Sequence, residues 1–301
     1  MKRGNDAMPV ITPRDVDIFR TLASGPMTSF QIRMDLRKFV SKDPGKNFNK
    51  GDVYSRDMSA DALKVRLSKL MREGYVTSGL YADRDGKGVH ALYILAHPAI
   101  ELLVQQHGFT PKHIRAALPN KYTVAHELQV VDIVKTIKRE GGRLGYQYDI
   151  EDENYLKKET QGAKRNMPYP DLHVKLFFKI GKEVDIKNFA VELDNGTMSE
   201  KVVAEKARKI YDEKKWISMI ICPNSQRIAK LRAGFAQYIE SEREGTEDEE
   251  SRQEIDKLYL RSFFATSYEF HENGFLKTKW LSIEGGSATV VPDDYKERSR
   301  K

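Results

Sequence analysis

The chain has 301 residues, which is enough for about two domains with cores of ordinary size. Hydrophobic residues make up 40% and charged residues 32% of it, the balance of a globular protein with a polar surface. The apolar run Trp216–Cys222 is far shorter than the roughly 18 residues that a membrane-spanning helix needs. A single cysteine, Cys222, excludes an intramolecular disulfide framework and a cysteine-cluster zinc site. No apolar segment follows Lys2 and Arg3 as in a secretory signal, so we expect a cytoplasmic protein.

Charge is distributed unevenly along the chain. Residues 1–120 carry 19 lysines and arginines against 12 acids, whereas residues 121–301 carry 32 of each, so the net charge of +7 lies in the first part. A basic first domain favours a polyanionic partner, above all nucleic acid, although a merely soluble basic surface has the same composition. The acidic segment 242–256 is most simply a solvated helix or a mobile segment, and a DNA-mimicking shield over a basic groove is the alternative.

Residues 1–108 show three helices followed by a hairpin and a fourth helix. Helical spacing, capping residues and helix breakers predict helices over residues 13–23, 28–39, 60–73 and 97–108, and period-two alternation predicts strands over 75–82 and 89–95. The polar residues 41–57 are predicted as a loop, and 83–88 as the hairpin turn. Helix, helix, helix, hairpin is the order of a winged helix-turn-helix, although this loop is longer than the usual helix–helix turn.

The third predicted helix has the two faces that a DNA-reading helix needs. Its apolar face consists of Leu63, Leu67, Leu70 and Met71, and its polar face of Asp61, Val65, Ser68, Lys69 and Arg72, flanked by Lys64 and Arg66. Long donors on the polar face reach phosphates and base edges in the major groove, and the hairpin tip reaches the phosphates beside it. A solvated amphipathic helix or a protein-binding winged helix has the same pattern. We predict contacts to double-stranded DNA from Lys64, Arg66, Ser68, Lys69, Arg72, Arg84 and Lys87.

After a linker over residues 109–122, residues 123–301 alternate helix and strand. Apolar spacing predicts helices over residues 126–140 (ended by Gly141 and Gly142), 199–213 and 226–240, and strands over 144–150, 172–179, 189–193 and 216–222, with further strands within 258–268 and 276–283. The segment from 151 to 168 is predicted as a polar, basic loop. The order indicates an α/β (α+β) fold, with a mixed sheet flanked by helices in this second domain.

Acidic residues converge on two of the predicted strands. Asp171 follows Pro170 at the start of one strand, and Glu192 and Asp194 share one face of the next because side chains alternate. A turn between the strands brings Asp171 beside Glu192. Carboxylates gathered at a sheet edge suit Mg²⁺ or Mn²⁺, which polarise a phosphodiester and activate water. Turn and edge-strand charge is the plainer interpretation of the same residues.

Pro170-Asp171 and Glu192 resemble the PD-(D/E)XK nuclease superfamily, whose pattern is Pro-Asp followed by acid-x-Lys on the next strand. The chain departs from the pattern at Asp194, which stands in place of the lysine. Lys206 is the candidate for a relocated lysine, because it borders the apolar face of helix 199–213 and can reach the carboxylates from the core edge. Lys175, on the face of Asp171, is the runner-up.

The run from Val191 to Thr197, followed by Lys206 and Tyr211, is similar to the replication-relaxation family, as is His126-Glu127-Leu128. The resemblance covers residues 10–240. It implies an N-terminal winged helix joined to a degenerate restriction-endonuclease-like domain, on plasmids, phages and integrative elements. It also implies replication control or mobilisation, with nicking by some relatives and no demonstrated chemistry in others.

The position of Glu127 matches an acid that some nucleases of the superfamily add from their first helix, and a solvated helix-start carboxylate is the equal alternative. His126, on the apolar stripe of its helix, is more simply a core histidine.

These patterns predict a DNA-binding protein of a mobile element. Asp171 and Glu192 hold Mg²⁺ or Mn²⁺, Asp194 and Glu127 are further metal-ligand candidates, and Lys206 stabilises the transition state. The alternative is a non-catalytic regulator whose second domain dimerises or recruits replication or transfer proteins. Whether the site cuts DNA and whether the chain forms a homodimer stay open. The sequence contains no phosphate-binding GxxxxGK[ST] loop, which speaks against a nucleotide-driven motor.

Overall fold

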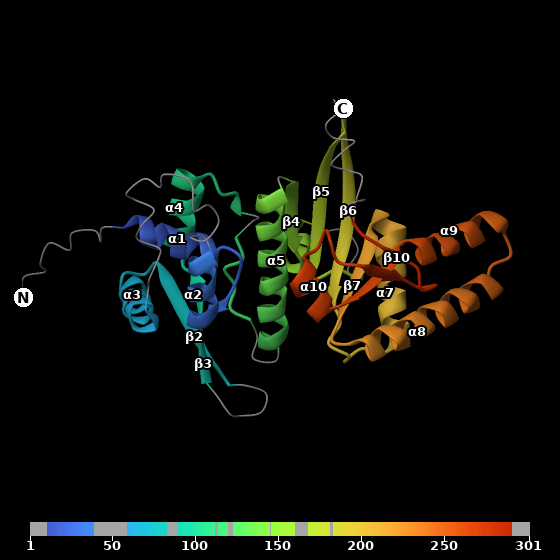
Figure 1. Ribbon diagram of the computed structural model, residues 1–301, viewed down its shortest axis with the longest axis horizontal. Helices are drawn as coiled ribbons and strands as arrows, with labels where there is room; N and C mark the ends of the chain where they lie inside the picture. The colour runs from blue at the N-terminus through green and yellow to red at the C-terminus, as the bar shows by residue number, and fades with distance from the viewer. Residues whose placement is uncertain are drawn as a thin grey trace, which may run out of the picture. The chain divides into compact units, whose positions relative to one another are not determined.

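A computed structural model describes residues 11–38, 59–82, 89–111, 114–119, 123–144, 146–159, 168–180 and 183–290 (Figure 1). The chain divides into two compact units, Met1–Val131 and Asp132–Lys301. The division lies inside helix α5 (Val124–Leu144), downstream of the linker expected over residues 109–122. Each unit combines helices with its own sheet, which confirms the mixed α+β class.

The first unit joins a helical layer to a small antiparallel sheet. Its elements are α1 (Pro13–Leu22), β1 (Met27–Thr28), α2 (Ser29–Lys38), α3 (Ala60–Arg72), β2 (Val76–Ala82), β3 (Val89–Leu95) and α4 (His97–His107). The strand order is β1-β3-β2. The predicted helices and hairpin are confirmed, in the element order of a winged helix-turn-helix. Strand β1 has only two residues, too few to show any alternation in a sequence.

Local sequence explains where these helices begin and end. Asp15 accepts hydrogen bonds from the backbone N and the hydroxyl of Thr12, both at 2.7 Å, at the start of α1. Ser59 Oγ accepts from the backbone N of Ala62 at 3.1 Å and caps α3. Helix α4 ends at Gly108, whose φ of 69° is the left-handed conformation that glycine adopts without strain.

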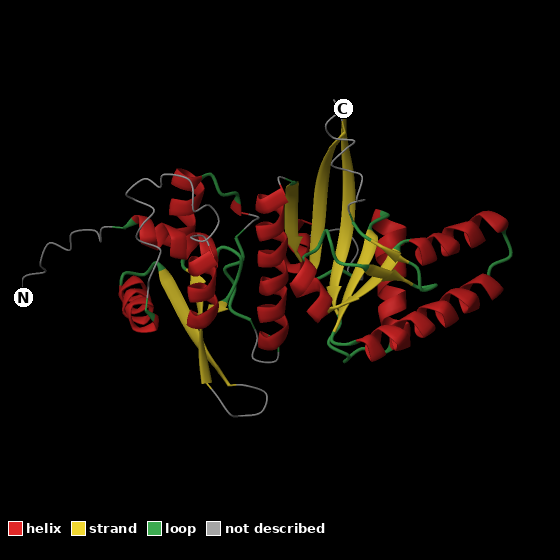
Figure 2. Cartoon of the chain, viewed as in Figure 1, coloured by secondary structure: helices red, strands yellow, loops and turns green. Residues whose placement is uncertain are grey.

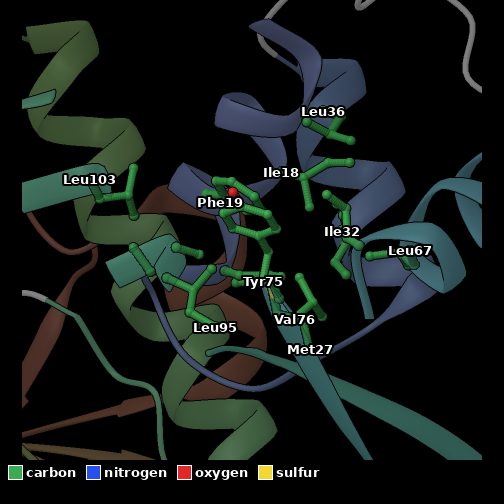
Figure 3. Packing of buried hydrophobic residues seen from close by; sticks show 14 of the residues in the cluster. Ile18, Phe19, Met27, Ile32, Leu36, Leu67, Tyr75, Val76, Leu95 and Leu103 are labelled. Atoms are coloured by element: carbon green, nitrogen blue, oxygen red, sulfur yellow. The ribbon is translucent and has the colours of Figure 1, made fainter. Parts of the chain in front are cut away.

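A separate hydrophobic core holds the first unit together (Figure 3). Every helix and strand of the unit contributes to it, and the ring of Phe19 stacks on that of Tyr75 with centroids 5.8 Å apart. Its main buried members are Ile18, Phe19, Leu22, Met27, Ile32, Leu36, Leu63, Leu67, Leu70, Tyr75, Val76, Leu95, Leu103 and Val131. Because each such side chain contributes about 1.5–3 kcal/mol when buried, the unit has a stabilising core of its own.

The second unit is built on one mixed sheet in the order β10-β9-β8-β7-β6-β5-β4. Figure 2 draws its strands in yellow and the helices in red. After α5 come β4 (Gln147–Asp152), α6 (Glu153–Glu159), β5 (Leu172–Ile180), β6 (Glu183–Leu193), α7 (Glu200–Lys214), β7 (Ile217–Cys222), α8 (Ser225–Glu244), α9 (Glu249–Leu260), β8 (Ser262–Thr266), α10 (Ser267–Asn273), β9 (Trp280–Ser282) and β10 (Ser287–Ala288). Strands β4, β5 and β6 are antiparallel, β6, β7 and β8 are parallel, and β9 and β10 are antiparallel again. The predicted order α-β-β-β-α-β-α is found with one addition, because α6 lies between β4 and β5.

The strand expected within residues 258–268 is confirmed as β8, and α10 follows it. The acidic segment 242–256 consists of the end of α8 and the start of α9, which agrees with the solvated-helix interpretation. Two local expectations were wrong. Helix α6 occupies part of the segment predicted as a loop. Helix α5 continues through Gly141 and Gly142 instead of stopping there. A side chain at Gly141 would lie 2.2 Å from the ring of Tyr148, so this glycine serves close packing rather than helix termination.

The two faces of β6 meet different partners. Phe189 packs edge-on against Phe275, in an aromatic cluster with Phe270 and Trp280. On the opposite face, α7, α8 and α9 share a core with β7 and β8, with buried members that include Val203, Ala207, Tyr211, Ile220, Leu231, Phe235, Ile255 and Phe264. Glu192 therefore points to the α7 side, because Phe189 and Glu192 are an odd number of residues apart.

Candidate functional site

Strand register sets the two predicted carboxylates opposite each other. Leu172 of β5 pairs with Val191 of β6, and one further step along the antiparallel ladder places Asp171 opposite Glu192. The carboxylate of Asp171 is fixed from the β6 side, because its Oδ2 accepts a hydrogen bond from the backbone N of Leu193 at 2.8 Å. The turn predicted to bring these residues together is thus a long β-hairpin, drawn in Figure 1 as the paired β5 and β6.

Lys206 reaches this pair from α7. Its Nζ donates a hydrogen bond to Glu192 Oε2 at 2.8 Å and lies 2.7 Å from Oε1. Glu192 is 7% exposed and the Lys206 side chain 22% exposed, so the ion pair is largely withdrawn from water. Lys201, one and a half turns earlier on α7, is by contrast 77% exposed. Lys206 therefore has the place predicted for the relocated lysine, while Lys175 lies on β5 opposite Asn188.

Burial and neighbouring charge act strongly on Glu192. Desolvation, with the negative charge of Asp171, raises the pKa of Glu192 above its usual value, although Lys206 opposes the shift. Burial disfavours the charge on Lys206, but the negative charges of Glu192 and Asp171 outweigh it and raise the pKa of the ammonium group. A buried carboxylate held beside a second carboxylate and a lysine is the kind of group that occurs at functional sites.

Glu153 is a further acid at this end of the sheet, which sequence reasoning missed. It begins α6 directly after β4, and its backbone N donates to the backbone O of Asp171 at 3.3 Å. Its charge adds to the upward shift of the Glu192 pKa, although its own carboxylate lies 2.7 Å from Lys157 Nζ. The signal in the sequence is the acidic pair Asp152-Glu153. It lies in the segment 151–168 that was predicted as a loop, so neither residue was assigned to a helix or a strand.

Asp194 faces a different set of groups from Glu192. Its Oδ2 and Oδ1 accept hydrogen bonds from Arg227 Nε and Nη2 at 2.6 and 3.1 Å. Arg227 also donates to Glu200 Oε1 and to the backbone O of Met198, both at 2.6 Å. Strand β6 ends at Leu193, so the alternation that predicted a common face for Glu192 and Asp194 stops one residue too early. Both oxygens of Asp194 are thus occupied within the protein.

Glu127 lies in the first unit, where its Oε2 accepts a hydrogen bond from Arg115 Nη2 at 2.8 Å. Its side chain is 23% exposed and that of Arg115 is 11% exposed. The carboxylate predicted as a helix-start charge or an additional metal ligand is therefore one half of a partly buried ion pair.

Two carboxylates at this site fit a hard divalent cation. Glu192 Oε1 is buried and, in the part of the chain that the structure describes, accepts no hydrogen bond, although it lies 2.7 Å from Lys206 Nζ, so a cation bound there would share this oxygen with the ammonium group. In the same part, no group of three or more His, Cys, Asp or Glu side chains is arranged to hold a metal ion. Mg²⁺ commonly binds through one or two carboxylates, with water and substrate phosphate as its other ligands. Asp171 and Glu192 meet that smaller requirement.

A buried histidine network adjoins the carboxylates on the same face of β5. His173 Nδ1 lies 2.9 Å from Glu151 Oε2, and its Nε2 lies 3.0 Å from Asn188 Oδ1. The imidazole stacks on the ring of Trp216, with centroids 3.7 Å apart and planes 7° from parallel. Burial lowers the pKa of His173, although Glu151 and Asn188 oppose the shift. The network ties β4, β5 and β6 together beside Asp171.

Helix α3 presents most of the predicted DNA contacts to solvent. Lys64, Ser68, Lys69 and Arg72 are exposed, while Leu63, Leu67 and Leu70 are fully buried. Arg84 and Lys87 lie outside the described residues.

Arg66 departs from the prediction. Its guanidinium forms a two-point pair with the fully buried carboxylate of Asp15 in α1, so it fastens α3 to α1 instead of facing outward.

Comparison with known proteins bears on both units. None of the helices in the described ranges is long and apolar enough to cross a bilayer. No curated protein and no solved structure matches the chain. The sequence profile described as replication-relaxation matches residues 26–214, which run from the residue before β1 through Asp171, Glu192 and Lys206 to the end of α7. The chain therefore belongs to the replication-relaxation family, which points to a role in the replication or mobilisation of a plasmid or another element.

Proposed function

We propose that this protein binds duplex DNA through α3 and nicks it at a Mg²⁺- or Mn²⁺-dependent site formed by Asp171, Glu192 and Lys206. The observation that carries the proposal is the Lys206–Glu192 ion pair, which is largely buried opposite Asp171. Removing two charges from water costs several kcal/mol per ion before their attraction offsets it, so such a pair is weak evidence for stability alone. Its position in the strand–strand–helix order favours a catalytic use.

Each residue has a distinct role in this proposal. Asp171 and Glu192 supply the carboxylate oxygens for the cation. When bound there, the cation polarises a phosphate oxygen and lowers the pKa of an attacking water. Lys206 directs its ammonium group at the charge that develops on the phosphate in the transition state. Because the backbone N of Leu193 fixes Asp171 and α7 holds Lys206, these groups are positioned before DNA arrives.

The first unit supplies the affinity for DNA. Helix α3 buries its apolar face in the core and exposes Lys64, Ser68, Lys69 and Arg72. These side chains suit phosphate oxygens and base edges in the major groove. Localised binding would bring one phosphodiester repeatedly to the second unit.

A non-catalytic DNA-binding regulator is the second candidate function. It is favoured by the departure at Asp194, where the nuclease pattern has a lysine and this protein has a carboxylate bound to Arg227. Lys206 also neutralises the charge of Glu192, so no metal cation is needed for that purpose. In this alternative the second unit serves dimerisation or recruits replication or transfer proteins.

Supercoiled plasmid carrying origin DNA of the element separates the two functions. The plasmid is incubated with protein and Mg²⁺ or Mn²⁺, and nicking is followed as open-circle product. We expect nicking by the parent protein, none by Glu192→Gln, and a rate lowered about 10²-fold or more by Lys206→Ala, since that is the usual effect of removing one transition-state donor. Lys201→Ala is the matched control, a lysine of the same helix on its exposed side, and it should nick at the parental rate.

Mobility shifts of the same samples complete the test. Both site variants should bind DNA as tightly as the parent, because α3 is unaltered. Retarded but uncut plasmid with the parent protein would establish the non-catalytic alternative. Linear product that depends on Glu192 would show that the site is catalytic but cuts both strands. Absence of both cleavage and retardation would contradict DNA binding itself.

A further inference from the structure

One large apolar side chain, Val65, lies on the exposed surface of α3. Val65 is 71% exposed. Its described neighbours on the helix surface, three, four and seven residues away, are exposed: Asp61, Ala62, Ser68, Lys69 and Arg72. The core of the unit is already filled from this helix by Leu63, Leu67 and Leu70, each with no exposed surface. Packing among the described residues therefore does not account for an apolar residue at position 65.

The surroundings of Val65 set it apart from other exposed apolar residues. Lone apolar side chains are common on protein surfaces, and exposure alone carries no meaning. Val65, however, is followed on the same face by the donors Ser68, Lys69 and Arg72, which match the phosphates and base edges of DNA, while Asp61 lies on its N-terminal side. When such donors engage the two sides of a groove, the residue between them is brought against the base edges on its floor.

The floor of the major groove offers one apolar group, the C5-methyl of thymine. We propose that Val65 contacts the C5-methyl group of a thymine, so that α3 reads an A·T pair at one fixed position of its site. This inference rests on the DNA binding proposed above and adds the base that is recognised.

The shape of valine suits this contact. Branching at Cβ leaves one strongly preferred χ1 rotamer in a helix, so the two methyl groups of Val65 have a fixed position before binding. Little side-chain entropy is then lost when they meet the thymine methyl. The short side chain also requires the helix to lie deep in the groove, which the longer Lys69 and Arg72 allow because they extend to the phosphates on either side.

Replacing thymine by deoxyuridine tests the contact directly. Binding sites are first selected from random duplexes with the full chain, and each thymine of the selected site is then replaced singly by deoxyuridine, which removes only the methyl group. At one position we expect the parent protein to bind about fourfold more weakly, the effect of one buried methyl or methylene group. Val65→Ala should bind the thymine site about as weakly as the parent binds the uracil site, and should not distinguish the two bases.

Lys64→Ala is the control for a contact that carries no base information. It should weaken both the thymine and the uracil site by the same factor and keep the fourfold difference between them. Unchanged thermal unfolding of Val65→Ala, expected for an exposed residue, shows that any effect comes from the interface.

Three outcomes would overturn the inference while leaving DNA binding intact. These are a selected site without an A·T pair under α3, a parent protein indifferent to every uracil, and a Val65→Ala variant that still senses the methyl group. If the chain selects no DNA at all, the proposed function fails first and this inference fails with it.

Discussion

Arg66 shows how one residue changes its role when its surroundings are known. On a helical wheel it flanks the polar face of α3, yet its guanidinium pairs with Asp15, which lies 51 positions earlier and is fully buried. Burial alone would raise the pKa of Asp15, but hydrogen bonds from Arg66 and Thr12, with the charge of Arg66, outweigh it and hold that pKa below its usual value. No periodicity within α3 reveals a partner in α1.

Asp15→Asn tests this pair. Removing one partner of a buried ion pair leaves the other charge uncompensated, so we expect the first unit to lose about 3 kcal/mol at pH 7. Because the pKa of Asp15 is lowered by folding, its contribution is present above the usual carboxyl pKa near 3.8 and is lost as pH falls through the lowered value. Urea unfolding at pH 7 and near pH 3 should show the difference between parent and variant shrinking in acid. A constant difference would contradict the pKa argument.

The candidate site residues also differ in whether the sequence alone predicts their contacts. Asp171, Glu192 and Lys206 are close together as predicted, because two strands in register and one helix after them determine their positions. Asp194 does not lie with them, because β6 ends one residue before it and its partner Arg227 is 33 residues further along the chain. Side-chain alternation predicts which residues of a hairpin share a face. It does not predict that a guanidinium group from another helix pairs with one of them.

At the scale of elements, Arg227 links three segments around the β6–α7 connection. From the first turn of α8 it holds Asp194 after β6, the carbonyl of Met198, and Glu200 at the start of α7. The position of α7, and with it the reach of Lys206 to Glu192, depends on this connection. Arg227 is therefore a positioning residue in the proposed site.

Arg227→Leu should loosen that connection. We expect about 3 kcal/mol lower stability of the second unit, because the nearly buried Asp194 carboxylate loses its partner. Thermal and urea unfolding measure this loss, with Lys230→Ala, an exposed lysine of the same helix, as a control expected within about 0.5 kcal/mol of the parent. If the two variants unfold alike, the Arg227 pairs do not stabilise the fold.

Element boundaries were predictable where periodicity is long and unpredictable where it is short. Helices α3, α7 and α8 have several turns of apolar spacing, and their positions are confirmed within a few residues. Helices α6 and α10 have seven residues each, about two turns, and their first residues could equally belong to a loop or strand. The prediction that α5 ends at its glycine pair failed for another reason. A side chain at Gly141 would collide with the ring of Tyr148, and no local sequence rule describes this contact.

For the whole molecule, the basic first part and the neutral second part predict a strong salt effect on DNA binding. The excess of 19 basic over 12 acidic residues lies in positions 1–120. Phosphate contacts release condensed counterions, so log Kd should rise linearly with log salt concentration. Lys69→Ala should reduce that slope by about 1, whereas Lys277→Ala, an exposed lysine of the second unit, should leave it unchanged. A slope near zero for the parent protein would contradict phosphate binding.

The stacking of Trp216 on His173 has a spectroscopic consequence. The chain contains two tryptophans. Trp280 is enclosed by phenylalanine rings and donates its indole N–H to the backbone O of Phe275 at 3.1 Å, a dry and constant environment. Trp216 instead lies flat against an imidazole two residues along β5 from Asp171. We therefore expect the emission of Trp216, rather than that of Trp280, to respond to changes beside Asp171.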